Sequence, residues 1–159
     1  MSASQNRDKP RIVAGVDGSP SSVDALCWAV RQAELSGGTI DAVIAWQYPM
    51  TAGGMGWAPM SGLDDTDYAE LAAKALSDSV GQVDAAANVS VRQVVRAGNP
   101  AQILLDAASG ADLLVVGSRG HGGFADALIG SVSQRCVHHA RCPVVVVHTS
   151  QHVADPIGD

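Results

Sequence analysis

The sequence predicts a single α/β domain built on an open, five-stranded parallel sheet. Its 159 residues fit one domain. Apolar residues make up 47% of the chain and aromatic residues only 4%, so the core must consist of Val, Leu, Ile and Ala, the usual filling of a parallel sheet between helices. Five strand-like runs alternate with four helical patterns, which implies parallel pairing through right-handed crossovers. We expect strand order 3-2-1-4-5 with helices on both faces.

The domain should span residues 10–149, with flexible ends at residues 1–9 and 150–159. The strand-like runs are short and apolar, and glycine, proline, serine and asparagine mark several of the boundaries between elements. The expected strands are residues 11–17, 39–46, 89–95, 112–117 and 143–148, and the expected helices are residues 20–37, 65–86, 100–109 and 131–140.

Two of these helices begin with a polar cap followed by proline. Ser19 and Asn99 are the expected N-caps, with Pro20 and Pro100 at the first helical position, where a missing N–H costs nothing. Gln102 is placed to complete a capping box with Asn99. These signals fix where the first and third helices start.

The composition of three other segments indicates where they lie in the fold. Residues 47–62 are rich in Gly, Met and Trp without periodicity; we expect a mobile connector, with a lid or a partner-binding patch as the alternative. Residues 89–95 alternate apolar and polar side chains, which indicates a strand at a sheet edge. Residues 112–117 are more apolar, which favours a central strand.

Composition and charge disfavour several classes of function. Ten Lys and Arg against sixteen Asp and Glu give a formal charge of −6, which opposes attraction to nucleic acid. The polar N-terminus and the lack of an apolar run of about 20 residues indicate a cytoplasmic protein with no membrane partner. Three cysteines at uneven spacings predict reduced thiols. Cys136 and Cys142 bracket two histidines, but their spacing does not match zinc-binding pairs.

A glycine pattern follows the fourth strand. Two residues separate Gly117 from Gly120, and nine more separate Gly120 from Gly130-Ser131, where a helix begins. Glycine lets a ligand approach the backbone, and the free N–H groups of a helix start bind anions. Neither a Gly-x4-Gly-Lys-Ser/Thr loop nor a Gly-x-Gly-x-x-Gly turn is present. We therefore expect backbone amides and the Ser131 hydroxyl to hold any phosphate.

The predicted topology places a second signal beside this one. In sheets of this kind, ligands bind beyond the carboxyl ends of the strands where the winding direction reverses, here between strands 1 and 4. Asp17, after strand 1, then faces the glycine loop. Its expected role is to accept hydrogen bonds from ribose hydroxyls or to help hold a divalent cation. Arg119 and His121 are the nearby side chains that add positive charge.

The segments IVAGVDGS and VVGSRGHGGFADALIGSVSQRCVHHARCPVVVV resemble the ATP-binding branch of the universal stress protein family, a Rossmann-like fold, over roughly residues 11–148. The resemblance implies ATP with Mg²⁺ or Mn²⁺ as the ligand. It also implies a homodimer formed through the last strand, Pro143 to Val147, an apolar edge. The implied contacts are Gly15 and Asp17 with ribose and phosphates, the Ala45 backbone with adenine, Val116 and Gly117 with the nucleoside, and Gly120, Gly130, Ser131 and Val132 with the phosphates.

Three functions remain open at this point. The first is a regulatory protein whose ATP-bound state is read by an unidentified protein partner during stress, with slow or no hydrolysis because no general base or cation pair stands by the phosphates. The second is a slow ATPase or nucleotidyl-transfer enzyme, with a metal on Asp17 and Arg119 or His121 acting on the phosphates. The third is a carrier of flavin or another cofactor, although the glycine spacing favours an adenine nucleotide.

Overall fold

The computed structural model describes residues 9–47, 62–83, 88–120 and 129–149. Strands and helices alternate along these ranges: β1 (Arg11–Gly15), α1 (Pro20–Ser36), β2 (Thr39–Trp46), α2 (Asp65–Gly81), β3 (Val91–Ala97), α3 (Pro100–Ala108), β4 (Leu113–Gly117), α4 (Ser131–His139) and β5 (Val144–Val147). The expectations for the two chain ends, for nearly all of the connector at 47–62 and for His121 fall outside the described residues.

The five strands form one parallel sheet in the order β3-β2-β1-β4-β5, so the predicted topology is confirmed. β1 pairs with β2 and β4, and Ala14 lies opposite Ala42 on one side and Val115 on the other. The winding direction therefore reverses between β1 and β4. The edge position predicted for β3 is also confirmed, and β5 forms the opposite edge.

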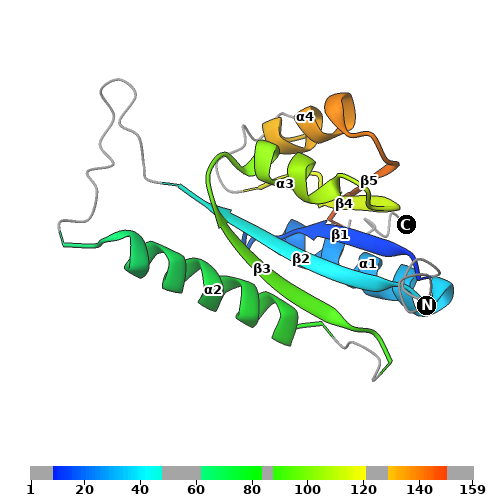
Figure 1. Ribbon diagram of the computed structural model, residues 1–159, viewed down its shortest axis with the longest axis horizontal. Coiled ribbons are helices and arrows are strands. Elements are labelled where there is room, and N and C mark those ends of the chain that lie inside the picture. The colour runs from blue at the N-terminus through cyan, green and yellow to red at the C-terminus, as the bar shows by residue number, and fades with distance from the viewer. Residues whose placement is uncertain (1–8, 48–61, 84–87, 121–128, 150–159) are drawn as a thin grey trace, which may run out of the picture.

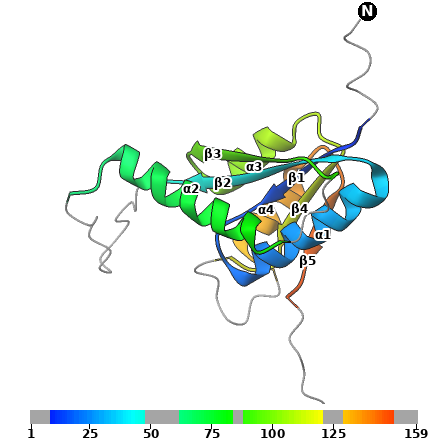
Figure 2. The ribbon, with the colours of Figure 1, turned by 90° about the horizontal axis from the view of Figure 1, so that it is seen from below.

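Helices cover both faces of the sheet (Figures 1 and 2). α1 and α2 pack on one face, and α3 and α4 pack side by side on the other. The core is divided accordingly into two layers. Successive residues of a strand point to opposite faces, so Ile12 and Ala14 join the layer of α1 and α2, whereas Val13 joins the layer of α3 and α4.

The helix starts agree with the predicted caps, with one exception. Ser19 Oγ accepts a hydrogen bond from the Ser22 amide, and Asn99 Oδ1 accepts one from the Gln102 amide. The predicted capping box at Asn99 is wrong, because the Gln102 side chain donates to Asp106 Oδ1 at 2.8 Å instead of returning to the cap. α2 carries a capping box that was not predicted, between Asp64 and Asp67.

Some predicted boundaries shift by a few residues. β1 ends at Gly15 rather than at residue 17, because Asp17 turns into the cap of α1. α2 ends at Gly81, five residues early, and β3 runs over 91–97 rather than 89–95 because its pairing with β2 extends to Ala97. No helix within the described ranges is long and apolar enough to cross a bilayer.

A charge cluster ties three strands together at the end of the sheet opposite the glycine loop. Asp41, 6% exposed, accepts hydrogen bonds from Arg92 at 2.7 and 2.9 Å and from Arg11 at 3.0 Å. Burial alone raises the pKa of Asp41, but the hydrogen bonds from the two arginines outweigh it and hold that pKa below its ordinary value. Arg11 also donates to the carbonyls of Ala107 and Ser109, which anchors the end of α3 to the sheet.

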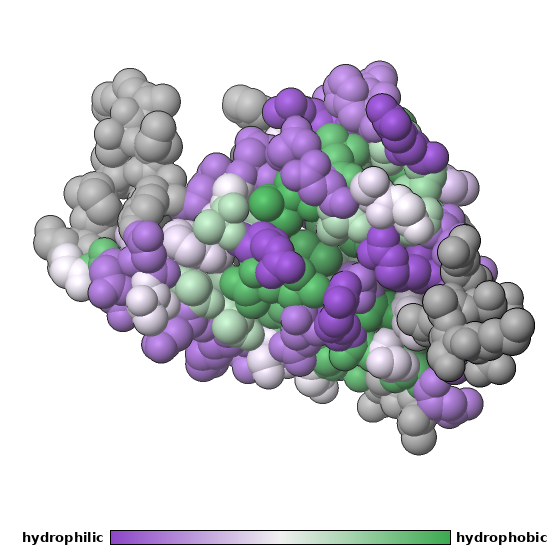
Figure 3. Space-filling view, in the orientation of Figure 1, coloured by the Kyte–Doolittle hydropathy of each residue, from purple (hydrophilic) through white to green (hydrophobic). Residues whose placement is uncertain are grey.

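Apolar and hydrophilic side chains are segregated on the face shown in Figure 3. Apolar side chains are visible in the middle of this face, between α3 and β3, and hydrophilic side chains surround them. The three valines at positions 91, 94 and 95 of the edge strand β3 are only half-buried. The hydrophilic groups also cover the top of the molecule in this view, over α4.

Candidate functional site: a crevice at the carboxyl ends of the strands

A cavity of about 370 Å³ lies where the strand order reverses, a volume within the usual range for ligand sites. Its walls come from the ends of β1, β2 and β4, the starts of α3 and α4, and the segments that follow β1 and β4. It brings together all ten residues predicted from the sequence: Gly15, Asp17, Ala45, Val116, Gly117, Arg119, Gly120, Gly130, Ser131 and Val132. Their roles toward a ligand stay predictions.

Seven further residues line the crevice and were not predicted. They are Val16, Ser22, Val43, Ile44, Pro100, Leu104 and Ser133. Val43 and Ile44 precede Ala45 on β2, so their position could have been inferred from that of Ala45. The two residues from α3 carry no such signal, because their place depends on how α3 packs over the sheet.

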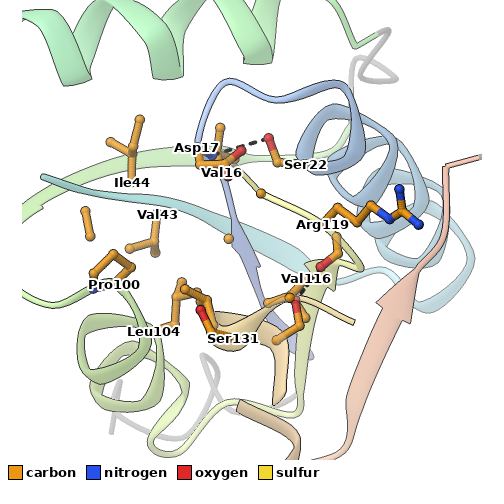
Figure 4. A pocket seen from close by; sticks show the side chains of 17 residues that line it. Val16, Asp17, Ser22, Val43, Ile44, Pro100, Leu104, Val116, Arg119 and Ser131 are labelled. Atoms are coloured by element: carbon orange, nitrogen blue, oxygen red, sulfur yellow. Dashed lines mark hydrogen bonds between the residues drawn. The ribbon is translucent and has the colours of Figure 1, made fainter. Parts of the chain in front are cut away.

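One side of the crevice is apolar. Val43 from β2 and Leu104 from α3 are buried in the core layer of α3 and α4, and Pro100 at the start of α3 is half-buried. Ile44, the next residue of β2, is buried in the layer of α1 and α2, and Figure 4 shows its side chain pointing the opposite way from that of Val43. β1 approaches α3 so closely that a Cβ on Gly15 would lie 2.9 Å from Leu104 Cδ1. An apolar group of a ligand could pack against this side of the crevice.

The β1–α1 junction, residues 16–19, holds a carboxylate at the mouth of the crevice. Asp17 Oδ1 accepts hydrogen bonds from the Ser19 amide at 2.9 Å and from the Ser19 hydroxyl. Gly18 between them has φ of 82°, a left-handed conformation that favours glycine. The Asp17 amide in turn donates to Ser22 Oγ at 3.3 Å, the bond drawn in Figure 4. The turn therefore fixes the orientation of the Asp17 side chain.

The glycine loop after β4 touches this carboxylate. A Cβ on Gly120 would lie 2.6 Å from Asp17 Oδ2, closer than two such atoms can approach. Any side chain at position 120 would therefore displace a carboxylate that Ser19 already holds. Gly120 is required for the contact between the segments that follow β1 and β4.

The β4–α4 junction comprises the described residues 117–120 and 129–131. Its first residue, Gly117, allows β4 to pack closely against α1. A Cβ there would lie 2.5 Å from Ser21 Oγ and 2.8 Å from the Ser21 carbonyl group, in the first turn of α1. The Ser133 hydroxyl donates to the Gly117 carbonyl at 2.5 Å, and the Gly130 amide donates to the Ser118 carbonyl at 2.6 Å. These bonds hold the start of α4 against the end of β4.

The N-terminus of α4 differs from those of the other three helices. Its N-cap is Gly130, which has no side chain to accept a hydrogen bond from the first turn. Sterics do not demand glycine here, because φ is −69° and a Cβ would lie 3.5 Å from its nearest neighbour, the Ser118 carbonyl oxygen. The N–H groups of Ser131, Val132 and Ser133, at the positive end of the helix dipole, therefore lack a cap from their own N-cap residue.

Among the described residues that line the crevice, charged side chains are few: Arg119 is the basic group and Asp17 the acidic one. Arg119 is exposed, and Figure 4 shows its side chain extending away from the other labelled side chains. The crevice thus offers backbone donors at the start of α4 and apolar side chains from β2 and α3, a combination that suits a ligand with an anionic end and an apolar end.

The described residues contain no group of three or more His, Cys, Asp and Glu side chains that could hold a metal. The nearby cysteine in α4 is part of the core: Cys136 is fully buried, and burial, with a smaller contribution from Cys142, raises its pKa to about 11. Cys136 is therefore a protonated thiol at neutral pH.

A family model and curated relatives point to the same protein family. Residues 10–148 match the model of the Universal stress protein family. A universal stress protein of Mycobacterium tuberculosis is 37% identical over 148 residues, which cover 91% of this chain and 46% of that protein. The chain thus spans about half the length of the curated relatives that it matches.

Solved structures share the fold. A universal stress protein in complex with cAMP has a TM-score of 0.62 and 26% identity, covering 90% of this chain and 99% of the other. One from Archaeoglobus fulgidus in complex with dAMP has a TM-score of 0.56 and 22% identity, covering 87% and 97%.

Proposed function

This chain belongs to the universal stress protein family, and from that premise we propose that its crevice binds ATP, with Mg²⁺ or Mn²⁺, in a regulatory role with slow or no hydrolysis. Similar proteins solved with cAMP and dAMP support an adenine nucleotide as the class of ligand. Because the matched relatives are about twice as long as this chain, the regulatory role is proposed for the domain described here.

One observation carries the proposal: the first turn of α4 opens on the crevice without a side-chain cap. The other three helices are capped by Ser19, Asp64 and Asn99. The amides of a helix start that has no side-chain cap can bind an anion, and the helix dipole favours negative charge there. Phosphate oxygens would take the place of the missing cap.

The remaining walls fit the other parts of the nucleotide. The apolar side formed by Val43, Pro100 and Leu104 suits adenine, and we assign the backbone of Ala45, which also lines the crevice, to the same ring. Asp17 has one carboxylate oxygen committed to Ser19 and the other directed at Gly120. We assign it to the ribose hydroxyls or to the metal that accompanies the phosphates.

Slow turnover follows from the shortage of charge in the crevice. Fast phosphoryl transfer requires cations that stabilise the transferring group and a residue that positions the attacking water. Among the described lining residues Arg119 is the one cation, and its side chain points outward. The carboxylate of Asp17 lines the crevice, so a slow ATPase or nucleotidyl transferase with a metal on Asp17 is the competing proposal. Phosphate release faster than about 1 s⁻¹ would favour it.

We also propose that the protein forms a homodimer through Pro143 to Val147. The four valines of β5 are half-buried and lie on an outer strand of the sheet, where unpaired backbone groups favour pairing with a second chain. The mass of the protein in solution tests this directly, and a monomer at micromolar concentration would exclude the dimer.

The nucleotide proposal is tested on the purified full chain. Mass spectrometry of small molecules released on denaturation should detect ATP, and added Mg²⁺-ATP should raise the melting temperature. Gly130→Asp should abolish this rise, because a carboxylate at the N-cap would occupy the amides and repel phosphate. The variant should still fold, since Asp is a favoured N-cap residue. Gly117→Asp is unsuitable, because its side chain would collide with Ser21.

A control variant separates a local effect from a change in net charge. Ser77→Asp adds the same charge at an exposed position of α2, which does not line the crevice. We expect it to keep the full thermal shift. Recovery of flavin, or the absence of any shift with Mg²⁺-ATP in the unmodified protein, would contradict the proposal.

A further inference from the structure

A second hollow lies between α3 and α4, separate from the crevice. Its volume is about 450 Å³. We call it the α3–α4 groove, and its lining residues are Gln102, Leu105, Asp106, Ser109 and Gly110 from α3 and the turn after it, with Arg135, His139 and Arg141 from α4 and the turn after it. Among the described residues, none lines both this groove and the crevice. The two hollows can therefore be tested independently.

The α3–α4 groove is basic in an acidic protein. The chain has a formal charge of −6 and only ten Lys and Arg residues, yet two arginines and a histidine line this groove against one carboxylate. Within the described part of the chain, neither Arg135 nor Arg141 forms an ion pair or donates a side-chain hydrogen bond to another described residue. Each guanidinium offers five donors, which match a carboxylate in pairs.

The one acid in the groove does not neutralise these arginines. Asp106 Oδ1 accepts a hydrogen bond from Gln102 Nε2 at 2.8 Å, so its nearest partner lies one turn back on its own helix. His139 and the last residues of α4 are exposed. Arg135 and Arg141 are exposed as well, so their guanidinium groups are accessible to an anionic partner.

The form of the anion follows from what else borders the groove. α4 ends at His139, so the negative end of its dipole lies here, next to Asp106, whereas the end of α3 already holds Arg11 on the carbonyls of Ala107 and Ser109. A compact phosphate would meet the negative potential of Asp106 and the α4 end with its full charge. A peptide instead carries its carboxylates on separate side chains, so its charge is spread over the two arginines and is not concentrated beside Asp106. We propose that the α3–α4 groove binds an acidic peptide segment of a partner protein.

The test uses the full chain and a fluorescein-labelled hexaglutamate peptide, with hexaglutamine and hexalysine as comparisons. Binding is followed by anisotropy at low ionic strength. We expect hexaglutamate to bind and hexaglutamine not to, and the double variant Arg135→Gln/Arg141→Gln to weaken hexaglutamate binding by about tenfold or more, with a loss of salt dependence. Hexalysine, which the net charge of −6 attracts, should not bind more weakly to that variant.

A matched control keeps this test specific. Arg31→Gln/Arg96→Gln removes the same charge from two exposed arginines, on α1 and β3, that do not line the groove. It should change the affinity by less than about twofold, because distant surface charges are screened. An equal loss in both double variants would overturn the proposal, since the peptide would then respond to net charge alone.

Two further outcomes contradict the proposal. If hexaglutamate fails to bind, or if inorganic phosphate binds the groove arginines where hexaglutamate does not, the groove is not a peptide site. The Mg²⁺-ATP thermal shift of the Arg135→Gln/Arg141→Gln variant should equal that of the unmodified chain. A failure of the groove proposal therefore leaves the nucleotide proposal unaffected, and the reverse also holds.

Discussion

The two strand-to-helix junctions that border the crevice differ in what completes the first turn of the helix. In the β1–α1 junction, side chains do so: Ser19 caps α1, and Asp17 binds the Ser19 amide and hydroxyl. In the β4–α4 junction, Gly130 occupies the N-cap and supplies no acceptor. In the β1–α1 junction, the chain's own side chains therefore bind the amides of the helix start. The other junction leaves its amides for a ligand, which is the physical basis of the proposed ATP site.

The glycines of the β4–α4 junction also differ from one another. Gly117 is a packing glycine, because a Cβ there would strike the backbone of Ser21 in α1. Gly130 has room for a side chain and a φ that any residue adopts. Two glycines of the same sequence pattern are therefore present for different reasons, and substitutions separate these reasons.

The largest expected effect is that of Gly117→Ala. The new methyl group would lie 2.8 Å from the Ser21 carbonyl carbon and oxygen, and backbone atoms cannot move aside cheaply. We expect the free energy of unfolding to fall by about 2 kcal/mol, typical of overpacking, as measured by urea denaturation. Gly130→Ala is the control, and its loss should be only about 0.5 kcal/mol, the difference between Gly and Ala at an N-cap. Equal losses would mean that the two glycines serve the same purpose.

The sequence predicts the positions of these glycines but not their different roles. Strand order could be predicted, and so could the gathering of Asp17, the loop from Gly117 to Gly120 and the helix start at 130–132, because Gly, Asp and Ser leave a local signal there. Gly15, Ala45 and Val116 leave no such signal, and the family resemblance alone implied them. A glycine gives no sign of which neighbour it approaches. Its contact with Ser21, 96 positions earlier, exists only once β4 packs on α1.

The lining residues that were not predicted also depend on contacts between distant parts of the sequence. Leu104 reads as an ordinary core position of α3, and it reaches the crevice only because α3 packs over the end of β1. The bond from Ser133 to the Gly117 carbonyl spans 16 positions and depends on the path of the loop. The capping box at Asn99 was wrong for a local reason, because Asp106 lies one turn from Gln102 and competes for its side chain.

A smaller effect is expected at the β1–α1 junction. Ser19→Ala removes the acceptor of the Ser22 amide and one of the two donors to Asp17. The loss of an N-cap of this kind costs about 1 kcal/mol, which urea denaturation should detect as a lower midpoint with an unchanged slope. The amides of α4 are untouched, so ATP should still raise the melting temperature. A complete loss of that rise would show that nucleotide binding depends on the Asp17 orientation set by Ser19, and not chiefly on the amides of α4.

The smallest expected change in stability comes from giving the second junction the cap of the first. Gly130→Ser places a hydroxyl where it can accept a hydrogen bond from the first turn of α4, and the protein without ligand should gain a few tenths of a kcal/mol. The same bond would occupy an amide proposed for phosphate, so the affinity for Mg²⁺-ATP measured by calorimetry should fall severalfold. A gain in stability together with a loss of affinity is expected where hydrogen-bond donors are left unpaired so that a ligand can use them. If Gly130→Ser binds ATP as tightly as the unmodified chain, the open helix start is not what holds the phosphates.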